Sequence, residues 1–89
     1  MTKYKIEFSN SASKQLRHFY QIDKNLYEHL RNAIYSLEAD PFQGKKLKGP
    51  FKGDYSLCVG NYRVIYTIHK THLIVHIIDL GHRKEIYRG

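Results

Sequence analysis

The sequence predicts a single α+β domain in which two helices pack on one face of an antiparallel sheet. Apolar residues recur at helical spacing in the first half of the chain and at every second position in the second half. The chain has only 89 residues, so we expect residues 1–89 to form one compact unit. Helices layered on one sheet face would bury the apolar side of both kinds of element.

Two helices are predicted between residues 9 and 41. Ser9 or Asn10 can cap the first helix, the break before the second falls at Asp23 or Lys24, and Pro41 ends the second. The residues that form the apolar stripes recur at helical spacing: Ala12, Leu16, Phe19 and Tyr20, then Leu26, Leu30, Ala33, Ile34 and Leu37.

Strands are predicted where apolar and polar residues alternate. An N-terminal strand covers residues 4–8, and a meander of three to four strands follows the helices, with strands near residues 55–59, 62–68 and 73–77. The basic loop before the meander contains a short strand around Lys46 to Lys48.

The dipeptide Gly60-Asn61 determines which residues share a sheet face. As a two-residue hairpin loop it pairs Val59 with Tyr62 and places Cys58 opposite Arg63. The face toward the helices then carries Tyr55, Leu57, Val59, Tyr62, Val64 and Tyr66. The second face carries Ser56, Cys58, Arg63, Ile65, Thr67 and His69, and a second two-residue turn at Lys70-Thr71 would add His72, Ile74, His76 and Ile78.

The net charge of +7 is concentrated in the second half of the chain. Residues 45–89 carry nine basic and three acidic side chains, which favours a phosphate-rich or acidic partner. The single Cys58 excludes an internal disulfide and indicates a reducing compartment. The charged N-terminus lacks the apolar run of a signal peptide, and no stretch approaches the roughly 20 apolar residues of a membrane span. We therefore expect a cytoplasmic protein without membrane contact.

Three groups of residues are candidates for binding or chemistry. Arg63, in mid-strand beside β-branched residues, needs an anionic partner or water. The last nine residues contain His82, Arg83, Lys84, Tyr87 and Arg88, which supply phosphate donors, proton-transfer groups and a stacking ring. The loop lysines Lys45, Lys46, Lys48 and Lys52 either grip RNA phosphates or are simply solvated.

Three runs of sequence, taken with the order of elements, resemble the RelE family of bacterial and archaeal toxins. The runs are Lys46-Leu47-Lys48-Gly49, residues 59–66 (VGNYRVIY) and residues 81–87 (GHRKEIY). The resemblance implies the toxin of a two-gene module that enters the A site of the 70S ribosome and cleaves the mRNA there. It further implies a reaction without metal or other cofactor, in which the 2′-hydroxyl attacks the adjacent phosphate and leaves a cyclic phosphate.

The resemblance also implies roles for individual residues. Arg63 would hold the scissile phosphate, and Arg83 would stabilise the charge that develops on it. Tyr87 would stack on a base or take part in proton transfer, and His82 is a candidate general acid or base. Positioning plus cations aimed at the developing negative charge is what RNA cleavage without a metal requires.

The sequence departs from the family pattern at Ser56 and Cys58, where basic residues are common. Lys48 or Lys52 could supply the missing charge. Two alternatives to an mRNA endoribonuclease therefore stay open: a ParE-type toxin that poisons DNA gyrase, and a module that binds ribosome or antitoxin without cutting. In each toxin case the resemblance implies an acidic, amphipathic antitoxin that wraps the toxin, and we expect it to cover or displace residues 83–87.

Overall fold

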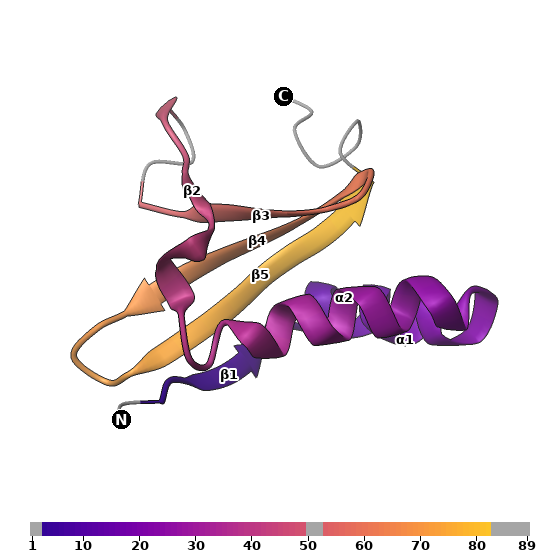
Figure 1. Cartoon of the computed structure of the whole chain (residues 1–89), viewed down its shortest axis with the longest axis horizontal. Coiled ribbons are helices and arrows are strands. Elements are labelled where there is room, and N and C mark those ends of the chain that lie inside the picture. Colours follow the sequence, from indigo (N-terminus) through magenta and orange to yellow (C-terminus); the bar gives the residue numbers. More distant parts are fainter. Residues whose placement is uncertain (1–2, 50–52, 83–89) are drawn as a thin grey trace.

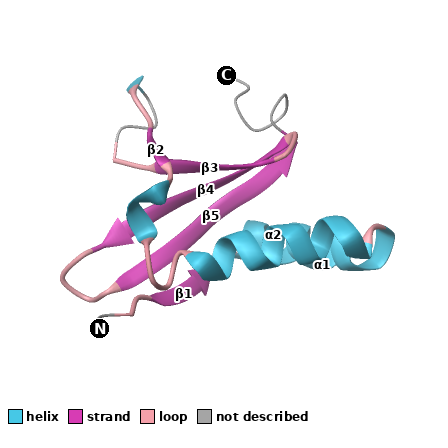
Figure 2. Cartoon of the chain, in the orientation of Figure 1, coloured by secondary structure: helices cyan, strands magenta, loops and turns pink. Residues whose placement is uncertain are grey.

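A computed structural model describes residues 3–49 and 53–82 of the chain. The predicted α+β fold is confirmed: two helices lie together on one side of a five-stranded sheet (Figure 1). The helices are α1 (Asn10–Ile22) and α2 (Lys24–Ser36), followed by a single 3-10 turn, η1 (Pro41–Gln43). The strands are β1 (Lys5–Phe8), β2 (Lys45–Lys46), β3 (Tyr55–Val59), β4 (Tyr62–His69) and β5 (Ile74–His82), as Figure 2 shows.

The sheet is mixed rather than purely antiparallel. Its strand order is β1-β5-β4-β3-β2, with β1 parallel to β5 and the other neighbours antiparallel. β2 is a two-residue edge strand that begins one residue before the predicted Lys46. The meander therefore occupies the centre of the sheet, and the N-terminal strand closes one edge.

Side-chain caps position both helices as predicted. The hydroxyl of Ser9 accepts from the Ala12 N–H (3.0 Å) and donates to the carbonyl of Ile78 (2.5 Å), so the start of α1 is tied to β5. A carboxylate oxygen of Asp23 accepts from the Leu26 N–H (3.2 Å) at the start of α2. Within the described ranges, no helix is long and apolar enough to cross a membrane.

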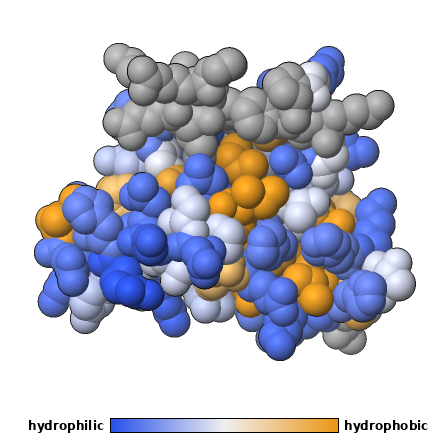
Figure 3. All heavy atoms as spheres, turned by 180° about the vertical axis from the view of Figure 1, so that it is seen from behind, coloured by the Kyte–Doolittle hydropathy of each residue, from blue (hydrophilic) through white to orange (hydrophobic). Residues whose placement is uncertain are grey.

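The core lies between the helices and the predicted inner face of the sheet. Its buried side chains are Ala12, Phe19, Leu30, Ile34, Leu37, Tyr55, Val64, Tyr66, Val75, Ile77 and Leu80. The prediction was wrong for Tyr20, which is 49% exposed and packs edge-on against Tyr27. Ser56 and Ile65 on the second face are also buried. Seen from behind, hydrophobic residues gather in a central band between hydrophilic ones (Figure 3).

The first hairpin has the predicted register, and the second turn does not. Val59 pairs with Tyr62 and Cys58 pairs with Arg63. The loop between β4 and β5 contains four residues, 70–73, rather than two, and Leu73 adopts a left-handed backbone (φ 56°). An even loop length preserves the faces of Ile74 and His76, whereas His72 falls in the loop instead of the strand.

A β-bulge changes the register of β5 beyond this point. The pairing shifts between Ile65 and Tyr66, so that Asp79 pairs with Ile65 and Gly81 pairs with Arg63. Ile78, expected on the second face, lies at this irregularity and has no partner in the β4–β5 register. The bulge decides where the residues at the end of β5 point.

Candidate functional site

Arg63 lies near the start of β4, on the sheet face away from the helices. The cross-strand pairing places it directly opposite Cys58, and its guanidinium donates a hydrogen bond to the Cys58 Sγ. Arg63 is half-buried and Cys58 is exposed. The predicted side-by-side placement of these two residues is therefore confirmed.

A second cation reaches the same face from β2. Lys45 pairs with Ser56, the residue two positions before Cys58 on β3. A pocket of about 280 Å³ lies here, lined by Lys45, Leu47, Ser56, Cys58 and Arg63, and we call it the Arg63 pocket. An ammonium and a guanidinium in one pocket form a site suited to a phosphate group.

A buried tyrosine fixes the chain just before Lys45. The hydroxyl of Tyr66 donates to the carbonyl oxygen of Pro41 (2.8 Å) and accepts from the Gly44 N–H (3.1 Å). Tyr66 has no exposed surface, and this burial raises the pKa of its hydroxyl to about 12. The two hydrogen bonds hold η1 and the start of β2 against β4, and thereby place Lys45 beside Ser56.

Gly44 makes this close approach possible. A Cβ at this position would lie 2.3 Å from the Tyr66 hydroxyl and 2.9 Å from the Ser56 carbonyl oxygen. Only a residue without a side chain fits here without a shift of the neighbouring chain. Sequence reasoning missed this anchor, although the Gly-Lys-Lys run after the helices marks it.

The structure does not bring His82 together with Arg63. His82 pairs with Tyr62, and the two rings meet edge-on with centroids 5.4 Å apart. Because Tyr62 itself packs edge-on against Phe19 of α1, His82 lies on the helix side of the sheet. A pocket of about 390 Å³ opens there, lined in part by Gln15, His18, Phe19, Tyr62, Asp79 and His82.

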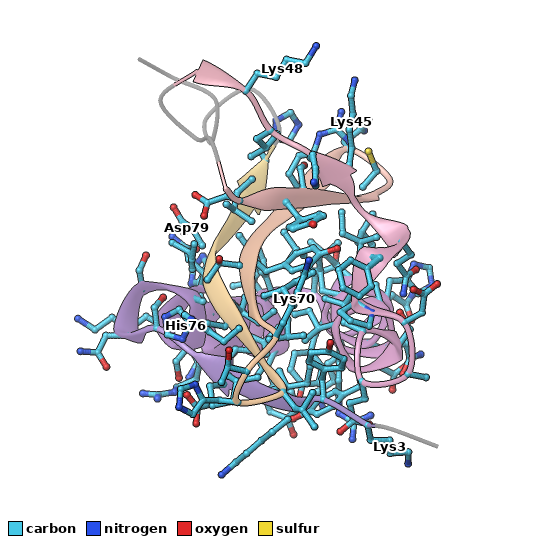
Figure 4. The ribbon with its side chains drawn as sticks, turned by 90° about the vertical axis from the view of Figure 1, so that its left-hand side faces the viewer. Lys3, Lys45, Lys48, Lys70, His76 and Asp79 are labelled. Atoms are coloured by element: carbon cyan, nitrogen blue, oxygen red, sulfur yellow. The ribbon has the colours of Figure 1, made fainter. Side chains whose placement is uncertain are left out.

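The loop lysines do not form one group either. Lys46 and Lys48 line a groove of about 560 Å³ together with Leu47, Tyr55, Ile68 and Lys70, which we call the lysine groove. Figure 4 shows Lys45 and Lys48 extending from the top of the molecule, with Lys70 below them. The remaining candidates, Lys52, Arg83, Lys84, Tyr87 and Arg88, lie outside the described residues.

The described residues hold no group of three or more His, Cys, Asp or Glu side chains that could bind a metal ion. What residues 3–49 and 53–82 do offer is electrostatic: two cations aimed at one position on the open sheet face. Such a site can orient a phosphodiester and stabilise charge on it.

Comparisons with known proteins agree with this fold. The family model described as the ParE toxin of the type II toxin–antitoxin system parDE matches residues 6–87. Toxin RelG of Mycobacterium tuberculosis is 30% identical over 86 residues, covering 96% of this chain and 97% of RelG.

Solved structures show the same architecture. The toxin–antitoxin complex RelBE2 of M. tuberculosis contains a chain that matches with a TM-score of 0.81 at 25% identity, covering 96% of this chain and 97% of that one. A chain of the archaeal RelE–RelB complex of Pyrococcus horikoshii matches with a TM-score of 0.75 at 25% identity, covering 94% and 99%. The chain belongs to the RelE/ParE superfamily and is a toxin of a type II toxin–antitoxin system.

Proposed function

We propose that this toxin is a ribosome-dependent endoribonuclease that cleaves mRNA in the A site and thereby inhibits translation. The observation that carries the proposal is the Arg63 pocket, where Lys45 and Arg63 converge on the sheet face away from the helices. The RelE resemblance assigns this face to the RNA. Lys45 also supplies a positive charge beside Ser56 and Cys58, the positions that lack basic side chains.

The chemistry that this pocket supports is transfer within the phosphodiester. The 2′-oxygen attacks the adjacent phosphorus and loses its proton, and the bond to the 5′-oxygen of the next nucleotide breaks. The products are a 2′,3′-cyclic phosphate and a 5′-hydroxyl, which gains the proton. Arg63 and Lys45 hold the non-bridging oxygens, where negative charge increases in the transition state.

The proton-transfer groups are assigned among the residues that follow β5. Arg83 and Tyr87 keep the roles that the resemblance implies, with Arg83 stabilising charge and Tyr87 stacking or moving a proton. His82, which lies on the helix side with Tyr62, is the weaker candidate for general acid or base because Arg63 occupies the other face. Lys84 and Arg88 are proposed to contact RNA phosphates.

A cognate antitoxin is the proposed protein partner. Several of the similar solved structures are toxin–antitoxin complexes, including RelBE2 and the archaeal RelE–RelB complex. An acidic, amphipathic antitoxin would neutralise the basic half of this chain and compete with RNA for it.

A second candidate function is inhibition of DNA gyrase. It is favoured by the match to the ParE family model and by the neutral side chains at Ser56 and Cys58. The two functions make different demands on Arg63, because only RNA cleavage needs a cation at the scissile phosphate.

The deciding experiment maps mRNA cleavage by primer extension in a translating extract, alongside a gyrase supercoiling assay. Wild-type toxin is compared with Arg63→Ala, with Arg83→Ala, and with Arg31→Ala as a control. Arg31 is exposed on α2, with its guanidinium 5.2 Å from the Tyr35 ring. We expect ribosome-dependent cuts that fall at least roughly 100-fold in Arg63→Ala and Arg83→Ala but persist in Arg31→Ala. Inhibited supercoiling without cleavage would instead establish the gyrase function.

A further inference from the structure

The lysine groove lies on the opposite face of the sheet from the Arg63 pocket. Tyr55 and Ile68 form its floor on the helix-side face, at the end of the sheet where η1 lies close by. Three lysines line it: Lys46 and Lys48 from β2 and the segment after it, and Lys70 from the loop between β4 and β5. The described lining contains no carboxylate.

The groove combines two properties that call for an amphipathic ligand. Leu47 and Ile68 are partly exposed aliphatic side chains, and the ammonium of Lys70 lies 5.5 Å from the centre of the Phe42 ring, which is itself 47% exposed. Apolar side chains would bury the aliphatic floor, and carboxylates would meet the lysines. A volume of about 560 Å³ has room for several side chains.

Protein fits this groove better than RNA does. A nucleobase would need a free aromatic face, but the Tyr55 ring already stacks on Tyr66, with centroids 5.5 Å apart, and meets Phe42 edge-on. The surface that remains between the lysines is aliphatic, and it gains nothing from phosphate or sugar. The groove also lies on the face away from Arg63.

We propose that the lysine groove is a docking site for an acidic, amphipathic protein segment, in which leucine-like side chains fill the floor and glutamate or aspartate side chains pair with Lys46, Lys48 and Lys70. The segment is provided by the antitoxin partner, so the inference rests on the proposed partner and not on the proposed RNA cleavage. It places one antitoxin contact at a distance from the Arg63 pocket, on the other side of β2.

The test is fluorescence anisotropy with a labelled ten-residue peptide that contains three Leu, four Glu and no basic residue. Two peptides with Gln in place of Glu, or Ser in place of Leu, and a labelled ten-nucleotide RNA serve as comparison ligands. Wild-type protein should prefer the Leu/Glu peptide to both altered peptides by on the order of tenfold. Lys70→Glu should weaken the Leu/Glu peptide by a similar factor, because it replaces an attraction by a repulsion.

Lys14→Glu is the matched control, because it reverses the charge of an exposed lysine on α1 and should leave peptide binding unchanged. Lys70→Glu should also cut mRNA at the wild-type rate if the toxin is a nuclease, so the two proposals fail separately. Equal peptide affinity in Lys70→Glu and wild type would overturn the inference, as would failure of the wild type to discriminate among the peptides. Loss of RNA binding in place of peptide binding would show that the groove holds nucleic acid.

Discussion

Lys45 and Lys46 are consecutive residues of β2, yet their side chains line two different depressions on opposite faces of the sheet. Lys45 pairs with Ser56 and contributes to the Arg63 pocket, whereas Lys46 pairs with the core residue Tyr55 and lines the lysine groove. Successive residues of a strand point to opposite faces, so pairing of only two residues is enough to separate them. The edge strand thereby divides one basic run between the proposed RNA site and the proposed protein site.

This division predicts unequal effects of two neighbouring substitutions. Lys45→Ala should lower ribosome-dependent mRNA cleavage by about tenfold, a modest loss because Lys45 is exposed and Arg63 remains in the pocket. Lys46→Ala should lower cleavage less, because its side chain lines the other face. Single-turnover cleavage rates on programmed ribosomes measure both, and equal losses would contradict the separation of the two lysines.

The anchor at Tyr66 predicts that Gly44 tolerates no side chain. Gly44→Ala would place a methyl group 2.3 Å from the Tyr66 hydroxyl and should lower the free energy of unfolding by about 2–3 kcal/mol. Gly81→Ala is the control, because a Cβ there meets nothing within 4 Å among the described residues. Urea unfolding followed by circular dichroism compares the two, and equal stability would show that the segment shifts without cost.

The raised pKa of Tyr66 predicts a loss of stability in strong alkali. The native hydroxyl stays protonated to about pH 12, whereas in the unfolded chain it ionises near its ordinary value of 10.0. The unfolded state therefore binds fewer protons between these values. Stability from this group is complete below about pH 10 and falls by about 2–3 kcal/mol as the pH rises to 12. Urea midpoints measured from pH 9 to 12 follow this loss.

Tyr66→Phe separates this contribution from the other tyrosines. At neutral pH the variant should be less stable by about 1–3 kcal/mol, because the Pro41 carbonyl and the Gly44 N–H lose their buried partner. Above pH 10 the difference from wild type should narrow, since phenylalanine has no proton to lose. A constant difference across the range would mean that Tyr66 does not titrate as its burial requires.

Local sequence rules predicted those parts of the fold that local interactions determine. The Ser9 and Asp23 caps and the Val59–Tyr62 pairing each depend on a few adjacent residues, and each is confirmed. The face of Arg63 followed from the two-residue loop alone. Half of the proposed pocket was therefore predictable.

The rest depends on contacts between distant segments. No sequence signal marks the bulge between Ile65 and Tyr66 or the left-handed Leu73, and the bulge sets the direction of His82. The position of Lys45 depends on the Tyr66 hydroxyl, which bonds to residues 22 and 25 positions away in sequence. Periodicity within one segment carries no information about such pairings.

Lys45 and a basic residue at position 58 should be interchangeable as sources of charge. Cys58 is exposed and directly opposite Arg63, so a lysine there has room to reach the same phosphate. Adding Cys58→Lys to Lys45→Ala should therefore restore cleavage to within about threefold of wild type, even though the Arg63 hydrogen bond to the thiol is lost. Single-turnover rates of the wild type, both single variants and the double variant complete the cycle. Thr67→Lys in the Lys45→Ala background is the control, because residue 67 shares the face but lies two pairs beyond Ser56–Ile65 along β4. If both lysine additions restore cleavage equally, only the overall charge of the face matters. If neither does, Lys45 acts through something other than its charge.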